Sequence, residues 1–208
     1  GPRDGLQSIE SIMSLSAKKA WIDAEAAAGV REIEVGSFVS AKLLPQMADT
    51  AEVVAHALTI PGLTVAVLVP NLKGLERARA AGADEVAIFP AASETFSQRN
   101  INQSIDEAMA AGKAVCDEAR GAGLRVRAYL STSFGCPFEG PVPAARVTEL
   151  TARLLDMGAY EVSLSDTIGI AHPGQVSDVL HQVTRRVPVA NLALHFHDTR
   201  GTALVNVY

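Results

Sequence analysis

The chain contains little that would support a secreted, membrane-spanning or nucleic-acid-binding protein. Its only cysteines, Cys116 and Cys136, form neither a metal-binding pair nor a disulfide framework, so we expect a reducing compartment. No long apolar run is free of charged residues, so we expect no membrane partner. The formal net charge is -5 and no block of Lys or Arg occurs, so we do not expect a nucleic-acid partner either.

The residues that are present indicate one α/β domain covering residues 1–208. Hydrophobic residues make up 48% and charged residues 20% of the 208-residue chain, which is the balance of a globular protein with a sizeable core. An eight-unit (β/α) barrel typically needs about 250 residues, so the length is short for that fold. The chain opens on Gly-Pro-Arg-Asp with no leader, and we expect an upstream segment to be missing.

A recurring pattern predicts parallel strands. A glycine precedes a short run rich in β-branched residues, as expected for a helix C-cap followed by a buried strand. The pattern begins at Gly29, Gly62, Gly82, Gly123 and Gly158. Alanine-rich amphipathic segments predict helices over residues 17–28, 72–81, 104–119, 144–157 and 173–185. Residues 192–197 resemble a sixth strand, and the opening GPRDG resembles the end of another whose body lies before residue 1.

This alternation of strands and helices predicts a parallel sheet, either closed into a (β/α) barrel or open and doubly wound. No GxGxxG phosphate loop is present, which argues against the dinucleotide-binding form of the open sheet. In a barrel, the reacting groups lie at the carboxyl ends of the strands. Polar residues that close the apolar runs are therefore the candidates for a site.

Two histidines close the last predicted strand. His195 and His197 are two residues apart, so their side chains point to the same side of a strand, an arrangement that suits a metal ion. The alternative is one inward histidine bonded to a carboxylate and one in a helix cap. A carboxylate from another strand, best supplied by Asp4, would give two histidines and one carboxylate with open positions, which favours Mg²⁺ or Mn²⁺.

Two carboxylates lie at other predicted strand ends. Glu34 lies inside the apolar run 33–35, where an unpaired carboxylate would be costly to bury. It either takes part in acid–base chemistry or forms a structural ion pair with Arg3. Asp166 precedes a Thr-Ile-Gly turn and could equally be a helix N-cap.

The remaining histidines and cysteines have structural interpretations. His56 and His181 lie on predicted helices, and His172 precedes Pro173 at a predicted helix start. Cys136, in a Cys-Pro loop without a nearby base, is expected to be structural.

Several strings, taken together and in order, resemble the 3-hydroxy-3-methylglutaryl-CoA lyase family of metal-dependent barrel lyases and synthases. They are GPRDGLQ from Gly1, EVGSFVS from Glu34, PQMAD from Pro45, PNLKG from Pro70, FGCPFEG from Phe134, SDTIG from Ser165 and HFHDT from His195. Leu6 favours the lyases, because the related isopropylmalate and homocitrate synthases usually have Glu there.

The resemblance implies a (β/α)8 TIM barrel and a carbon–carbon lyase that forms acetyl-CoA and acetoacetate. It implies that Asp4, His195 and His197 hold a divalent cation, Mg²⁺ or Mn²⁺, and that Arg3 faces the thioester. Glu34 and Asp166 would orient Arg3 and relay protons, with the base left open among Asp166, His195 and a bound water.

The resemblance also implies where the substrate is contacted and what the protein associates with. The substrate-binding residues would be Gln7, Ser37, Asn100, Arg127 and Thr167. We expect an acyl-CoA substrate, a homodimer, and a bacterial cytoplasm as the compartment, or the mitochondrial matrix if the source is eukaryotic.

Three departures from the family pattern leave alternatives open. Residues 7–10 read QSIE where the family commonly has QNEK, which favours a lyase or aldolase for another branched 3-hydroxyacyl-CoA. The loop with the family's catalytic cysteine has no counterpart up to Tyr208. This departure leaves open a second alternative, a catalytically silent paralogue that binds metal or acyl-CoA without turnover. The further asparagine ligand and the eighth strand are also absent, so we expect a barrel truncated at both ends. A metal-dependent hydrolase would explain the two histidines alone.

Overall fold

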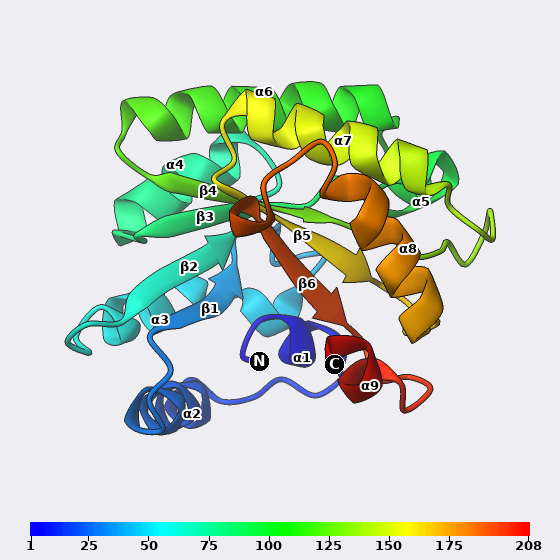
Figure 1. Cartoon of the computed structure of the whole chain (residues 1–208). Helices are drawn as coiled ribbons and strands as arrows, with labels where there is room; N and C mark the ends of the chain where they lie inside the picture. The colour runs from blue at the N-terminus through cyan, green and yellow to red at the C-terminus, as the bar shows by residue number, and fades with distance from the viewer. The chain divides into compact units, whose positions relative to one another are not determined.

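The structure is a computed structural model that describes all residues from 1 to 208 (Figure 1). The strands are β1 (Glu32–Ser37), β2 (Thr64–Leu68), β3 (Glu85–Ile88), β4 (Arg125–Leu130), β5 (Glu161–Asp166) and β6 (Leu192–Phe196). The α-helices are α1 (Asp4–Gln7), α2 (Leu15–Ala27), α3 (Thr50–Ala57), α4 (Leu72–Ala81), α5 (Glu94–Ile101), α6 (Ile105–Gly121), α7 (Ala144–Met157), α8 (Pro173–Val183) and α9 (Ala203–Val207). Two 3₁₀ turns are η1 (Pro45–Met47) and η2 (Val189–Asn191).

The predicted α/β alternation is confirmed. Each of the five glycine-led segments contains a strand, and the segment from residue 192 forms β6. All five glycines have positive φ, and Gly82 and Gly158 are the left-handed C-caps of α4 and α7, two helices whose predicted ranges match the structure. A left-handed cap suits glycine because it has no Cβ to clash with the preceding carbonyl.

The chain divides into two compact units. The first unit comprises Gly1–Ile88 and Glu118–Arg125, and the second comprises Phe89–Asp117 and Val126–Tyr208. Strands pair in parallel and in sequence order within each unit, β1 with β2 and β2 with β3, then β4 with β5 and β5 with β6. Barrel closure and a single domain remain predictions.

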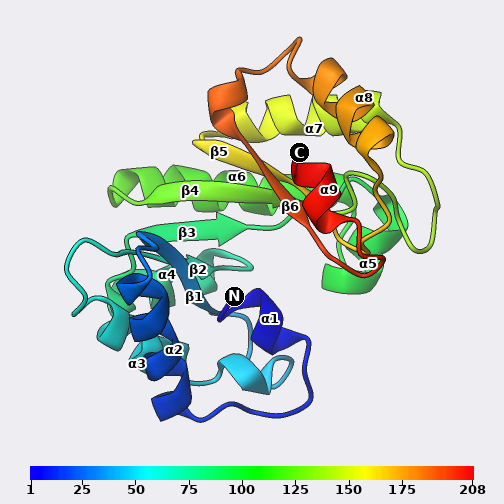
Figure 2. The same ribbon diagram turned by 60° about the horizontal axis from the view of Figure 1, so that its bottom comes forward.

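In the first unit, helices cover strands that are buried along most of their length. Ile33 and Val35 of β1 and Val65 and Val67 of β2 are almost fully buried. Helix α2 packs beside α3, which in turn packs on β1 (Figure 2). Apolar side chains on both faces of parallel strands are the expected pattern for a sheet that helices cover.

A β-bulge lies near the carboxyl end of β1. Glu34 pairs with Ala66 and Gly36 pairs with Val67, so the intervening Val35 has no partner of its own across the sheet. Bulges bend a strand and change the direction of nearby side chains. The bulge therefore influences how Glu34 is presented at this end of the strand.

A buried lysine connects α2 to the segment before α3. Lys18 is 3% exposed, and its Nζ donates to the carbonyl of Gln46 and pairs with Asp49, each at 2.5 Å. The Nε2 atom of Gln46 donates to the carbonyl of Ile9 at 2.6 Å. These contacts hold the segment that follows α1 against η1.

In the second unit, α7 and α8 pack against each other and α7 packs on β5 (Figure 1). The rings of Phe134 and Phe196 lie 5.7 Å apart at the carboxyl ends of β4 and β6, and Phe134 is 1% exposed. The core of this unit therefore reaches the ends of the strands where the candidate residues lie. No helix in the chain has the length and apolar character needed to cross a bilayer.

The close packing of Gly36 against Thr50 predicts that Gly36→Ala destabilises the fold. An added Cβ would lie 2.6 Å from Thr50 Oγ1, which donates to Met47 O at 2.8 Å and accepts from Ser37 N at 3.2 Å. We expect the free energy of unfolding in urea to fall by about 1–3 kcal/mol, as for other overpacked sites. Gly121→Ala is the control, since its Cβ would meet nothing within 4 Å. Equal midpoints for the two variants would contradict the expectation.

Candidate functional site

In the first unit, Arg3 and Glu34 form a bidentate ion pair. Arg3 Nε donates to Glu34 Oε1 at 3.0 Å and Arg3 Nη2 donates to Oε2 at 3.1 Å. The side chains are 10% and 13% exposed. The ion pair that the sequence offered as one interpretation of Glu34 is therefore formed, and its two parallel bonds fix the plane of the guanidinium group.

The same guanidinium group contacts the carboxylate of Asp4. Arg3 Nη1 and Gln7 Nε2 both donate to Asp4 Oδ1, at 3.2 and 3.1 Å. The Asp4 side chain is 29% exposed. Arg3, Asp4, Gln7 and Glu34 are thus brought together around α1 and β1. Asp4, which the sequence analysis placed at the end of a strand, instead begins helix α1.

Ser37 lies at the end of β1 but is fully buried. Its Oγ accepts from the backbone N–H of Val39 at 3.2 Å, and its backbone is held by Thr50 Oγ1. This placement favours a role in shaping the turn after β1, and its predicted contact with substrate remains a prediction.

In the second unit, Asp166 ends β5 and is 1% exposed. Its Oδ1 accepts from Ile170 N at 3.0 Å and its Oδ2 accepts from Ala171 N at 2.9 Å. Asp166 therefore closes the turn of residues 167–171. It is not a helix N-cap, because His172 occupies that position in α8 and accepts from Gln175 N at 3.3 Å.

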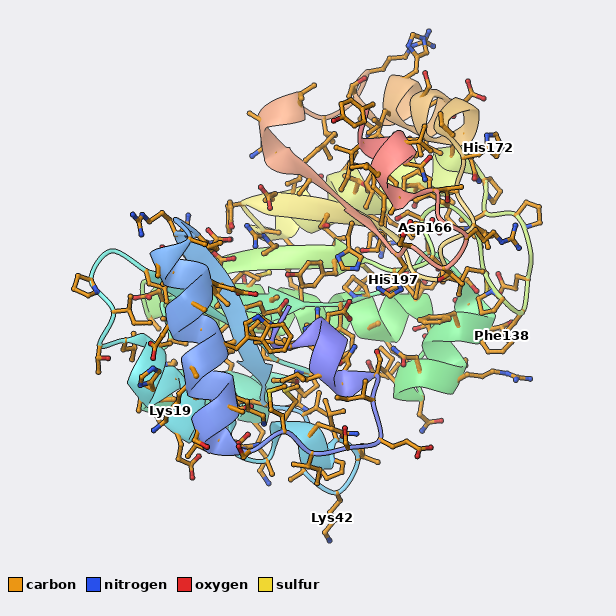
Figure 3. All side chains as sticks on the ribbon, turned by 90° about the horizontal axis from the view of Figure 1, so that it is seen from below. Lys19, Lys42, Phe138, Asp166, His172 and His197 are labelled. Carbon is orange, nitrogen blue, oxygen red and sulfur yellow. The ribbon has the colours of Figure 1, made fainter.

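His195 and His197 lie next to Asp166 in the sheet. Ser165 and Asp166 of β5 pair with His195 and Phe196 of β6, and His197 follows directly. The two imidazole rings are 4.9 Å apart in an edge-on arrangement, and a nitrogen of each lies within 4.8 Å of the other. Figure 3 labels Asp166 and His197 in this part of the second unit.

The other predicted substrate contacts differ in their surroundings. Thr167 Oγ1 accepts from the N–H of Thr132 at 2.8 Å, close to the turn that Asp166 closes. Asn100 is exposed on α5. Arg127 pairs at 2.7 Å with Glu161, the first residue of β5, which is the opposite end from Asp166 and favours a structural role.

The loop after β4 is organised around a buried thiol. Cys136 Sγ accepts from Ser93 Oγ at 2.9 Å and from the N–H groups of Phe138 and Glu139 at 3.3 and 3.4 Å. The backbone N–H of Thr95 donates to Glu139 at 2.5 Å and is the main cause of the lowered pKa of that carboxyl group. These contacts support the structural interpretation of Cys136.

His56 and His181 lie on helices, as expected. His56 Nε2 lies 2.8 Å from Asp23 Oδ1, and His181 Nε2 lies 2.9 Å from Arg185. Sequence reasoning missed Asn206, which is 6% exposed in the short helix α9. Its only signal was a single amide within the apolar run ALVNV.

The site residues lie in a chain with clear similarity to known proteins. The family model described as HMGL-like matches residues 1–208. The mitochondrial hydroxymethylglutaryl-CoA lyase of Bos taurus is 50% identical over 206 residues, covering 99% of this chain. The chain spans 63% of the length of that relative.

The chain is also similar to solved structures of hydroxymethylglutaryl-CoA lyases. The hydroxymethylglutaryl-CoA lyase of Pseudomonas aeruginosa has 48% identity and a TM-score of 0.97, and the match covers 100% of this chain and 69% of that one. An HMG-CoA lyase of Acinetobacter baumannii, in complex with coenzyme A and 3-methylmalate, has 34% identity and a TM-score of 0.93, with 99% and 67% of the two chains covered.

The two bonds that Asp166 accepts predict that Asp166→Asn destabilises the second unit. The amide would replace one acceptor oxygen with an NH₂ group facing a backbone N–H. We expect a loss of about 1–3 kcal/mol in the free energy of unfolding, since a buried donor would be left unsatisfied. Urea denaturation measures it, with the exposed Asp178→Asn as control. Unchanged stability in Asp166→Asn would refute the role of this carboxylate in holding the turn.

Proposed function

Because the chain belongs to the HMGL-like family, we propose that the protein is a divalent-metal-dependent carbon–carbon lyase that cleaves 3-hydroxy-3-methylglutaryl-CoA to acetyl-CoA and acetoacetate. The observation that carries the proposal is the Arg3 guanidinium group, held in one plane by Glu34 beside the Asp4 carboxylate. Names of relatives and the lyase structure with bound coenzyme A support the substrate class.

The reaction requires a proton to leave the C3 hydroxyl and a pair of electrons to be accepted. As the hydroxyl oxygen becomes the ketone of acetoacetate, the C2–C3 bond breaks and its electrons form the enolate of acetyl-CoA, which is then protonated. Arg3 would face the thioester oxygen, where negative charge develops. A preorganised cation at that position lowers the barrier electrostatically.

We propose, as the family resemblance implies, that Asp4, His195 and His197 hold the cation. The paired imidazole nitrogens and the partly exposed carboxylate fit a divalent ion, because two histidines and one carboxylate leave coordination positions for substrate oxygens. When bound, Mg²⁺ or Mn²⁺ would polarise the substrate hydroxyl and carbonyl oxygens.

The protein's own groups would orient the reactants and move the proton. Glu34 holds Arg3, and Asp166 holds the turn beside the histidines, so both would act first by positioning. The base that takes the hydroxyl proton is assigned to Asp166, His195 or a bound water. Gln7, Thr167 and the exposed Asn100 would contact substrate. Ser37 would act through its bond to the backbone of Val39, and Arg127 through its ion pair with Glu161.

The proposed partners follow from the same family. We propose an acyl-CoA substrate, a homodimer, and a cytoplasmic or mitochondrial location, supported by relatives named as mitochondrial or cytoplasmic lyases. A second candidate substrate is a related branched 3-hydroxyacyl-CoA. It is favoured by the exposed segment Ser8–Glu10 directly after α1, which differs from the common family sequence.

Arg3→Gln should abolish most of the lyase activity of the full-length protein. Loss of one preorganised donor at a developing charge costs about 100- to 1,000-fold in kcat. The measurement is acetyl-CoA release from 3-hydroxy-3-methylglutaryl-CoA with Mg²⁺ and a thiol reductant. Exposed Arg186→Gln is the control and should retain wild-type activity.

Other outcomes of this assay distinguish the candidates. Wild-type release that persists in Arg3→Gln would overturn the role of Arg3. A wild-type protein that binds Mn²⁺ but releases acetyl-CoA only from another branched 3-hydroxyacyl-CoA would favour the second substrate. Mn²⁺ binding without turnover of either compound would indicate a silent paralogue.

His195→Ala should weaken Mn²⁺ binding by the full-length protein. Removing a nitrogen ligand leaves the ion with fewer protein bonds, and we expect Kd to rise by at least about tenfold. Electron paramagnetic resonance of free Mn²⁺ measures Kd without substrate. His181→Ala, which removes an exposed helical imidazole, is the control. Stoichiometric Mn²⁺ binding of unchanged affinity in His195→Ala would exclude that ligand.

A further inference from the structure

Two loops at the carboxyl ends of β5 and β6 lie in direct contact within the second unit. One is the turn 167–171, and the other is the segment 197–206, which includes most of α9. A Cβ on Gly169, which has φ +64°, would lie 2.5 Å from Thr199 Oγ1 and 2.8 Å from the carbonyl oxygen of His197. The turn closed by Asp166 therefore packs on the backbone that follows the histidine pair.

One side chain bonds the second loop to the first. Asn206 Nδ2 donates to the carbonyl of Ala171 at 3.1 Å, and the N–H of the same Ala171 donates to Asp166 Oδ2. Upstream, Asp198 Oδ1 accepts from Ala203 N at 2.9 Å and so fixes the start of α9. Hydrogen bonds therefore link Asp198, which follows His197, to the start of α9, and link Asn206 of α9 to Ala171 and so to Asp166.

Stability alone does not account for an asparagine at this position. Asn206 is 6% exposed, yet its Oδ1 has no protein hydrogen-bond partner, and neither does the buried Oγ1 of Thr202 one helical turn earlier. A buried polar atom without a partner destabilises the folded protein. An apolar side chain would avoid that cost but would lose the bond to Ala171.

We propose that Asn206 is a positioning residue that holds the Asp166 turn in register with the His195–His197 segment. The role in catalysis rests on the proposed function, whereas the mechanical role does not. Asn206 acts through Ala171 and Asp166 and is not proposed to contact substrate or metal. Its loss would free the turn to move relative to the imidazoles that are proposed to hold the cation.

The chain offers a matched control at the other end of the same two strands. Asn191 Nδ2 donates to the carbonyl of Tyr160 at 2.7 Å, immediately before β5, and Asn191 lies immediately before β6. Asn191 and Asn206 therefore make the same type of bond, from an asparagine amide to a backbone carbonyl. Only the Asn206 bond lies at the end of the strands where Asp166 and the histidines are found.

The first test is hydrogen exchange at the amides of Ile170 and Ala171 in full-length Asn206→Ala. We expect these amides to exchange about tenfold faster or more, because a bond of about 1.4 kcal/mol no longer closes the turn. Asn191→Ala should leave them protected to the wild-type level. Asn206→Asp, which keeps the shape and removes the amide donor, gives a second variant if the alanine variant does not fold.

The second test measures Mn²⁺ affinity and the kinetics of the same variants. We expect Asn206→Ala or Asn206→Asp to raise the Mn²⁺ Kd and lower kcat by about tenfold each, within the range for residues that support metal ligands, with KM little changed. Asn191 variants of equal thermal stability should retain both values. A purely structural role would lower stability in both pairs and leave kcat and Kd unchanged.

Each outcome has one interpretation. Wild-type exchange at Ile170 and Ala171 in both Asn206 variants would overturn the proposal. Faster exchange with unchanged kcat and Mn²⁺ affinity would also overturn it, because the turn would then be mobile without consequence for the site. A wild-type protein with no lyase activity would refute the proposed function, and the exchange and Mn²⁺ measurements would still decide the role of Asn206.

Discussion

The ion pair between Arg3 and Glu34 is the interaction on which the candidate residues of the first unit depend. A carboxylate inside a buried strand is tolerated only when a cation and hydrogen bonds replace its water, and the bidentate guanidinium group supplies both. Helix α1 has four residues, which is too short to be stable alone. It is held from one side by this pair and from the other by Gln46, which binds Ile9. Asp4 and Gln7 lie between the two anchors.

In the second unit, backbone N–H groups stabilise the buried carboxylate of Asp166. Both oxygens of Asp166 accept hydrogen bonds from N–H groups of the turn that follows. These bonds offset the cost of burying the charge and also fix the shape of the turn. The histidine pair ends the neighbouring strand, and parallel pairing brings the two ends together. Sheet register supplies the rough placement of these groups, and the loop contacts through Gly169 and Asn206 refine it.

Sequence reasoning succeeded where a signal repeats. Strands followed glycines in the left-handed region and long helices showed a full amphipathic period, so β1 to β5 and helices such as α4 and α7 were predictable. Helices α1, α5 and α9 have 4, 8 and 5 residues, and neither α1 nor α9 has enough turns for a periodic pattern. Candidate residues at strand ends were found by position alone. The pairing of Glu34 with Arg3 was among the sequence interpretations. The partners of Asp166 and Arg127 were not found, because Asp166 bonds backbone atoms of its own turn and Arg127 bonds a glutamate 34 positions away.

The charges around Asp4 bear on how the proposed cation ligand and an arginine can lie side by side in the first unit. Arg3 alone would repel a divalent ion, and at a separation of about 4 Å two unit charges interact by about 4 kcal/mol near a protein surface. Glu34 cancels the charge of Arg3 through two short bonds, which leaves the negative charge of Asp4 to attract the ion. Because Arg3 and Gln7 both donate to Oδ1 of Asp4, the carboxylate is also fixed in orientation. Glu34 would therefore serve both proposed roles of this region, because it orients the guanidinium group proposed to face the thioester and neutralises that group beside the proposed metal ligand.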